Sequence, residues 1–287
     1  MRGDGDGWTR CDLGHEHWGL HGAAGLLVRA PGADHSSHVL LQHRAQWSAS
    51  GGTWGVPGGA RDSHESAEQA AVREAGEETS LDADALSVRA EHDDDHGRWS
   101  YVTVVADAPS LLPTVLQRES IELRWVREDE VEQLPLHPHF ALSWPRLRAR
   151  PVRLVVDAAN VVGSRPDGWW RDRAGAAERL LDRLSGLPAT TVALPEGGFG
   201  WVADLLVVVE GAARRAGTAA AEGAGVTVVR AAGSGDDALV DVVTGAAVDG
   251  AGIDTVVVTA DRGLRARLPQ PVAATGPGWL LAELDRR

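Results

Sequence analysis

The stretch Gly58–Leu81, GGARDSHESAEQAAVREAGEETSL, constrains the fold of this chain more than any other. Within it, Glu74, Glu77 and Glu78 stand at positions i, i+3 and i+4, so they share one face of a helix. Like charges at this spacing repel, and the only cation nearby is Arg73. A cluster of carboxylates becomes favourable when it binds a hard divalent cation such as Mg²⁺.

Two explanations fit the three glutamates taken alone. One is a helix over residues 65–78 that exposes an ordinary content of Glu to solvent. The other is a helix that binds Mg²⁺ or Mn²⁺, which would neutralise phosphate oxygens and polarise a phosphoryl group for attack by water. Gly58 and Gly59 favour the second explanation, because glycines allow close backbone approach or positive φ. A free carbonyl at Gly59 would add a metal ligand.

The full spacing of the stretch resembles the signature of the Nudix hydrolase family, G-x5-E-x7-R-E-U-x-E-E-x-G-U, in which U is aliphatic. The matching residues are Gly59, Glu65, Arg73, Glu74, Ala75, Glu77, Glu78 and Leu81. The resemblance covers roughly residues 20–150. It implies that residues 1–150 form a MutT-like Nudix domain with an α+β fold, a mixed sheet around one helix.

Two residues depart from this signature. Ser80 stands where the family has a Gly beyond the helix, in left-handed geometry that is easy for Gly. We expect Ser to lose ~1 kcal/mol there, with more effect on the loop than on metal binding. Ala75 replaces a larger aliphatic residue, so we expect slightly looser packing of the helix.

The resemblance also implies roles for the matching residues. Glu74, Glu77 and Glu78 would bind the metal, Arg73 would orient a carboxylate through charge-assisted hydrogen bonds, and Glu65 would brace the loop that begins at Gly58. The residues expected to be catalytic are Arg73, Glu74, Glu77, Glu78 and Glu119. Glu119, in ESIELRW, stands where MutT-like members carry a further Glu, as a fourth metal ligand or a general base; an exposed turn residue is the alternative.

The implied reaction is hydrolysis of a phosphoanhydride in a nucleoside diphosphate derivative, with a modified nucleoside triphosphate as the favoured substrate. Water attacks phosphorus, a carboxylate takes its proton, and metal ions stabilise the developing charge. Trp99 and Tyr101 are candidates to stack a base, although most such rings pack in cores. His137 and His139 lie where MutT-like enzymes read the purine edge. A nucleotide sensor that binds without turnover is the alternative function.

A second group of polar residues, CDLGHEHWGLH, brings Cys11, His15, His17 and His21 together near the start of the chain. Zinc accepts these ligand types, but the spacing matches neither two knuckles nor two helical histidines. We therefore interpret the segment as a polar entry into the first strand with a His facing the nucleotide, and we keep a zinc site as the alternative.

Residues 151–287 alternate short β-branched runs with helical segments. This alternation predicts an α/β domain, a Rossmann-like parallel sheet with helices on both faces, and sites in such sheets lie at the carboxyl ends of strands. Asp157, Glu210 and Asp261 fall at those ends. We place the boundary between the two domains near residue 150, in the Pro- and Arg-rich segment Ser143–Arg153.

The pattern strand-D-x-x-N, followed by a GDD helix and a strand-x-D, resembles PIN-like nucleases of the NYN group. The resemblance implies that Asp157, Asp236 or Asp237, and Asp261 bind Mg²⁺ or Mn²⁺ for phosphodiester hydrolysis, with Asn160 in support. Helix capping by these aspartates is the alternative. Asn160 is the only Asn of the chain.

The composition limits the kinds of partner that this chain is expected to bind. The net charge is −13 and the basic residues are all Arg, which argues against a surface that coats nucleic acid but does not exclude a local site that holds a nucleotide or RNA through metal ions. The N-terminal sequence has no apolar core and no run reaches membrane-span length. With a single Cys, we expect a cytoplasmic protein without membrane partners.

Overall fold

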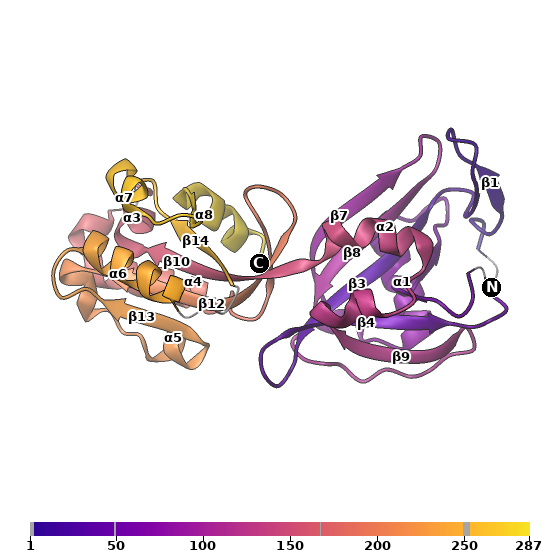
Figure 1. Ribbon diagram of the computed structural model, residues 1–287, viewed down its shortest axis with the longest axis horizontal. Helices are drawn as coiled ribbons and strands as arrows, with labels where there is room; N and C mark the ends of the chain where they lie inside the picture. The colour runs from indigo at the N-terminus through magenta and orange to yellow at the C-terminus, as the bar shows by residue number, and fades with distance from the viewer. Residues whose placement is uncertain (1–2, 49, 167, 249–252) are drawn as a thin grey trace. The chain divides into compact units, whose positions relative to one another are not determined.

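The strand AAGLLVRAP, β3 (Ala23–Pro31), is buried along its whole length except its last residue, and it lies at the centre of the first half. The computed structural model describes residues 3–48, 50–166, 168–248 and 253–287. It separates into two units, Met1–Ala149 and Arg150–Arg287 (Figure 1). Each unit is built on its own sheet and has its own apolar core.

The first unit contains a seven-stranded mixed sheet of order β5-β4-β3-β8-β7, with β6 paired to β3 and β9 to β4. The pair β3–β8 is parallel, whereas β4 and β6 run antiparallel to β3. Its other strands are β4 (Ser37–Arg44), β5 (Trp54–Gly55), β6 (Gly58–Ala60), β7 (Ser87–Asp95), β8 (Ser100–Asp107) and β9 (Ser120–Arg127). A separate antiparallel hairpin is formed by β1 (Trp8–Arg10) and β2 (Glu16–Trp18). The α+β architecture expected for this half is confirmed.

Helix α1 (Ala67–Thr79) covers this sheet with a face of alanines. Ala67, Ala70, Ala71 and Ala75 are buried against apolar side chains of β3 and β8. Small side chains let the helix approach the sheet closely, so Ala75 lies inside a continuous alanine face. The helix begins two residues after the predicted start, because Ser66 caps it in a reciprocal pair of hydrogen bonds with Gln69.

The second unit contains six strands in the order β11-β12-β10-β14-β15, with β13 paired to β12. The pairs β10–β14, β14–β15 and β12–β13 are parallel, and β11–β12 is antiparallel. The strands are β10 (Ala149–Asp157), β11 (Thr191–Ala193), β12 (Phe199–Val209), β13 (Val226–Arg230), β14 (Asp254–Val258) and β15 (Ala273–Thr275). The helices are α3 (Ala158–Gly163), α4 (Arg173–Leu184), α5 (Ala219–Gly223), α6 (Gly235–Val248), α7 (Arg262–Arg267) and α8 (Pro277–Asp285).

Successive side chains of β10 point to opposite faces of this second sheet. Leu154 and Val156 share a core with buried residues of α4 and α8, whereas Val155 shares one with residues of α6 and α7. Helices therefore cover both faces of the sheet. With β10 taken as the first of the parallel strands, the sheet order reverses between β10 and β14, and ligands of α/β sheets bind at such a point.

Three further segments have regular structure. The acidic run Asp93–Asp95 is the end of β7 and pairs with β8. The segment Ser143–Arg153, in which the two units meet along the chain, contains the end of α2 (Pro138–Leu147) and the start of β10. Residues Glu128–Gln133 form a 3₁₀ turn.

Ser80 has φ 58° and ψ 27°, the left-handed conformation expected at this position. Its N–H donates to the Gly76 carbonyl at 2.9 Å and thus ends α1. Because Gly adopts this geometry without strain, Ser80→Gly is expected to raise the free energy of unfolding by about 1 kcal/mol. Denaturant titration followed by fluorescence and circular dichroism measures the change. Ser80→Ala is the matched control, because it removes the hydroxyl that Gln117 contacts but keeps the Cβ. Equal stabilisation by both changes would contradict a backbone origin.

Candidate functional site

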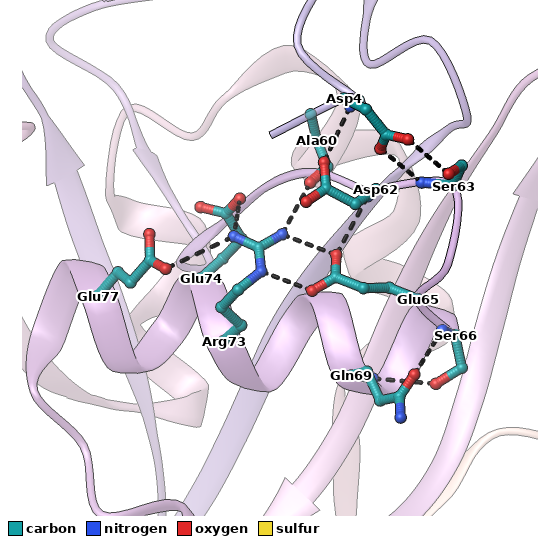
Figure 2. A network of polar contacts seen from close by, with 11 residues as sticks. Asp4, Ala60, Asp62, Ser63, Glu65, Ser66, Gln69, Arg73, Glu74 and Glu77 are labelled. Carbon is teal, nitrogen blue, oxygen red and sulfur yellow. Dashed lines mark hydrogen bonds and ion pairs between the residues drawn. The ribbon is translucent and has the colours of Figure 1, made fainter. Parts of the chain in front are cut away.

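The guanidinium of Arg73 joins three segments of the first unit, as Figure 2 shows. It donates to both carboxylate oxygens of Glu65, at 2.6 and 2.9 Å, and to the carbonyl of Ala60 at 3.1 Å. Its remaining Nη donates to Glu74 Oε1 at 2.8 Å, and Glu77 lies 3.8 Å away. These charge-assisted hydrogen bonds hold the pKa of Glu65 below its usual range. Arg73 thus fixes the loop, β6 and the helix relative to one another.

The two glycines of β6 allow the carboxylates of α1 to reach the backbone. A Cβ on Gly59 would lie 2.6 Å from Cδ of Glu74, and a Cβ on Gly58 would lie 2.4 Å from the carbonyl oxygen of Ala24. The N–H of Gly58 donates to Glu78 Oε2 at 2.9 Å. Neither glycine can therefore be replaced without moving a neighbour.

Burial has the largest effect on the pKa values of the carboxylates at this site. It raises the pKa of Glu78, whose residue is 8% exposed, to about 7, although hydrogen bonds from Gly58 and Gln42 act in the opposite direction. Burial also raises the pKa of Glu74; Arg73 opposes this, and the charges of Glu77 and Glu119 add to it. Glu119 therefore lies within electrostatic range of the cluster.

The oxygen donors in this part of the fold are of the type that suits a hard divalent cation. Glu74, Glu77 and Glu78 offer only carboxylate oxygens, the ligand type that Mg²⁺ and Mn²⁺ prefer, although among the described residues these three carboxylates do not all lie within 4.8 Å of one another. Burial makes ionisation of Glu74 and Glu78 unfavourable in the metal-free protein, and a bound cation would reverse that cost. Glu77, whose side chain is 66% exposed, is the carboxylate most open to solvent.

A cleft of about 400 Å³ borders the two glycines of β6. Its volume lies in the range of small-molecule sites. Its lining includes Trp8, Trp18, Arg44, Gly58, Gly59, His96, Trp99, Tyr101, His137 and His139. The carboxylates that contact Gly58 and Gly59 thus stand at the margin of a cleft rich in aromatic rings and imidazoles.

Comparison with known proteins identifies the family. The NUDIX domain model matches residues 19–146. A protein found in two strains of Mycobacterium tuberculosis, provisionally named 8-oxo-dGTP diphosphatase 3, is 61% identical over 159 residues, which make up 53% of this chain and 72% of the relative. The chain belongs to the Nudix family.

Two further relatives extend the comparison. A Nudix hydrolase from M. smegmatis, RenU, has a crystal structure that is 55% identical, with a TM-score of 0.47, and covers 50% of this chain and 92% of its own. A Bifidobacterium longum protein, named a nucleoside triphosphate pyrophosphatase/Nudix hydrolase fusion protein, is 42% identical over 51% of this chain and 31% of its own length. The enzyme is a Nudix pyrophosphohydrolase.

The Nudix site includes two residues of β4 that the sequence did not single out. Gln42 is 1% exposed, donates to Ser120 Oγ at 2.9 Å and hydrogen-bonds Glu78. Arg44 lines the cleft, and its charge lowers the pKa of Glu78. A signal was present, because Gln42 interrupts the apolar run VLLQ, where a buried polar residue needs a partner.

The expected substrate-binding residues of the Nudix domain all line the cleft. Trp99 is buried and His17 stacks on one face of its ring, whereas Tyr101 is partly buried. Burial lowers the pKa of His137 to about 4, with smaller effects from Arg44 and His139. The imidazole of His137 is therefore neutral near pH 7.

In the second unit, hydrogen bonds join the expected residues Asp157 and Asn160 to the end of β14. Asp157 accepts from the N–H of Asn160 and from Thr259 Oγ1, each at 3.0 Å. Asn160 Oδ1 accepts from the N–H of Ala260 at 2.7 Å. The carboxyl ends of β10 and β14 are thus linked at the point where the sheet order reverses.

The acidic residues around this point interact. Burial raises the pKa of Asp157, and the charges of Asp236 and Glu210 raise it further. Burial, followed by the charge of Asp261, raises the pKa of Asp236. Of the two candidates at the start of α6, Asp237 forms an ion pair with Arg267, whereas burial and the charges of Asp261 and Glu210 raise the pKa of Asp236. The sequence had marked Glu210 only as a strand-end carboxylate; here it also accepts the N–H of Gly235 at 2.7 Å.

Two aspartates of the second unit also cap helices. Asp157 caps α3 by accepting the N–H of Asn160, and Asp261 caps α7 by accepting the N–H of Leu264 at 2.8 Å, as the alternative interpretation held. Besides burial, the charge of Asp261 also raises the pKa of Asp236. Among the described residues, none of the helices combines the length and the apolar character that crossing a membrane requires.

Proposed function

We propose that the Nudix domain hydrolyses the phosphoanhydride of a nucleoside triphosphate, and that a modified nucleoside triphosphate is its favoured substrate. The observation that carries this proposal is the buried carboxylate of Glu78 and the partly buried carboxylate of Glu74, held against the two glycines that line the cleft. Two relatives support it, because their names describe an 8-oxo-dGTP diphosphatase and a nucleoside triphosphate pyrophosphatase.

Each residue of the site has a task in this reaction. Glu74, Glu77 and Glu78 would hold Mg²⁺ or Mn²⁺ with the Gly59 carbonyl, and Arg73 keeps Glu74 in place. The bound cation would supply charge neutralisation at the phosphate oxygens. Glu119, an exposed residue on the turn before β9, takes the proton of the attacking water or adds a ligand.

The cleft contains groups suited to a nucleobase. Trp8 and Trp18 line it and are 62% and 44% exposed, so they offer open aromatic faces. Neutral His137 has one ring nitrogen that donates and one that accepts, which matches the mixed donors and acceptors of a purine edge. We place this activity in the cytoplasm, where nucleoside triphosphates are abundant.

Replacing Glu74 or Glu78 by Gln tests the reaction. Each change removes a charged ligand but keeps the side-chain volume, so kcat/KM with Mg²⁺ should fall by at least ~100-fold. The assay measures pyrophosphate and nucleoside monophosphate released from natural and oxidised nucleoside triphosphates. Glu68→Gln, on the exposed first turn of the same helix, is the matched control and should retain activity.

The competing function is a nucleotide sensor that binds without turnover. Binding of a nucleotide by the full chain, without metal-dependent turnover of any nucleotide in the panel, would favour the sensor and reject the hydrolase. A variant that still binds nucleotide but no longer releases product separates loss of catalysis from loss of folding.

We further propose that the second unit is a PIN-like domain with metal-dependent ribonuclease activity. The observation that favours it is the mutual electrostatic interaction of Asp157, Glu210, Asp236 and Asp261. Carboxylates gathered at strand ends can hold Mg²⁺ or Mn²⁺ for phosphodiester hydrolysis. A scaffold or RNA-binding domain without catalysis is the alternative.

Asp157→Asn in the full chain tests this activity. The change removes one charge at the centre of the acidic group, and cleavage of labelled single-stranded RNA with Mn²⁺ should fall by at least ~100-fold. The control is Asp237→Asn, because Asp237 is engaged by Arg267. Equal cleavage of RNA by the parent and by Asp157→Asn would reject the proposed metal site. RNA binding without cleavage would favour the scaffold.

A further inference from the structure

Four potential metal ligands from two distant parts of the chain meet beside the cleft. They are Cys11, His15, His17 and His96, and their ligand atoms all lie within 4.8 Å of one another. His17 Nε2 and His96 Nδ1 are 3.2 Å apart. The sequence suggested His21 for this group, but His21 is not among the ligands that meet here; His96 is, although it lies far along the chain.

The spacing suits tetrahedral coordination. With Zn–N near 2.0 Å and Zn–S near 2.3 Å, tetrahedral angles place neighbouring ligand atoms roughly 3.3–3.6 Å apart. The distance between His17 and His96 already has that scale, and the other pairs of ligand atoms, all within 4.8 Å, need to close by at most about 1.5 Å. One Cys and three His form a set of sulfur and nitrogen donors that zinc prefers over Mg²⁺.

The backbone around these ligands is ordered by hydrogen bonds. The turn between β1 and β2 is closed by Cys11 N–H to the His15 carbonyl and by Gly14 N–H to the Cys11 carbonyl, both 3.0 Å. Asp12 N–H donates to the His96 carbonyl at 3.1 Å and joins this hairpin to the turn between β7 and β8. Backbone hydrogen bonds therefore connect the two turns that carry the ligands.

Burial and stacking also favour a site at this place. Cys11 is 4% exposed and His17 is 7% exposed, whereas His15 is exposed and leaves an entry path. The ring of His17 lies on Trp99, with centroids 3.8 Å apart and planes 10° apart, and Trp99 Nε1 donates to the Gly19 carbonyl at 3.0 Å. Such support fixes the orientation of a metal-binding imidazole.

We propose that Cys11, His15, His17 and His96 bind one Zn²⁺ ion in a structural site that is separate from the carboxylate site of α1. Four protein ligands fill a tetrahedral shell, so the ion has no open position for catalysis. It ties the β1–β2 hairpin, which carries Trp8 and Trp18, to the β7–β8 turn. Because His17, His96 and Trp99 line the cleft, the ion would fix one wall of it. The proposal does not depend on the identity of the nucleotide.

The test uses the full chain after removal of metals with a chelator, in excess Mg²⁺ to occupy the carboxylates. Zn²⁺ titration against a chromophoric chelator should give one tight equivalent. Co²⁺ should give the visible bands of tetrahedral coordination together with a thiolate-to-cobalt charge-transfer band. Added Zn²⁺ should also raise the thermal unfolding midpoint.

Single substitutions of the proposed ligands test which residues bind the Zn²⁺ ion. Cys11→Ser should lose the charge-transfer band, and His96→Gln should weaken Zn²⁺ binding by on the order of 100-fold or more, because changes of supporting residues alone cost up to that amount. His21→Gln is the control and should bind like the parent. The proposal is overturned if the parent chain binds no tight Zn²⁺, if its Co²⁺ spectrum lacks the charge-transfer band, or if both ligand variants bind as tightly as the parent. If the parent chain binds one Zn²⁺ but hydrolyses no nucleotide, the proposed function is rejected and this zinc site is retained.

Discussion

The guanidinium of Arg73 is the interaction on which the Nudix site depends. It occupies the one position from which a single side chain can reach the loop carboxylate of Glu65, the β6 carbonyl of Ala60 and the helical carboxylate of Glu74. A planar group with five N–H donors can do this, whereas the ammonium of Lys cannot. Without it, the partly buried carboxylate of Glu74 would lose the cation that donates to it, and the loop before α1 would lose its attachment to the helix.

The small residues of this region, the glycines of β6 and the alanines of α1, determine how closely the helix packs on the sheet. Ala70 and Ala71 are fully buried, and Gly58 and Gly59 leave no space for a Cβ, so helix, strand and sheet pack at short distance. This packing forces the carboxylates out of water, and their raised pKa values report the cost. Burial therefore adds a desolvation cost to the like charges of the sequence, and a bound divalent cation would offset that cost.

The sequence predicts those parts of the site whose geometry depends on local spacing along the chain. Glu65, Arg73, Glu74 and Glu78 lie within one loop and one helix, so their order along the chain fixes their relation in space. The left-handed backbone of Ser80 is likewise a local property, and it was expected. Gln42, Arg44 and His96 were missed, because they reach their sites by strand pairing across tens of residues. The choice between Asp236 and Asp237 was also beyond the sequence, since it depends on Arg267, which belongs to another helix.

Anomalous diffraction from crystals grown with Mn²⁺ and a non-hydrolysable nucleoside triphosphate tests the central claim most directly. Data collected on both sides of the manganese absorption edge locate the ion without reference to activity. We predict a manganese peak bonded to the carboxylates of Glu74 and Glu78 and bridging to phosphate oxygens in the cleft. A nucleotide bound in the cleft with no manganese at these carboxylates would contradict the account.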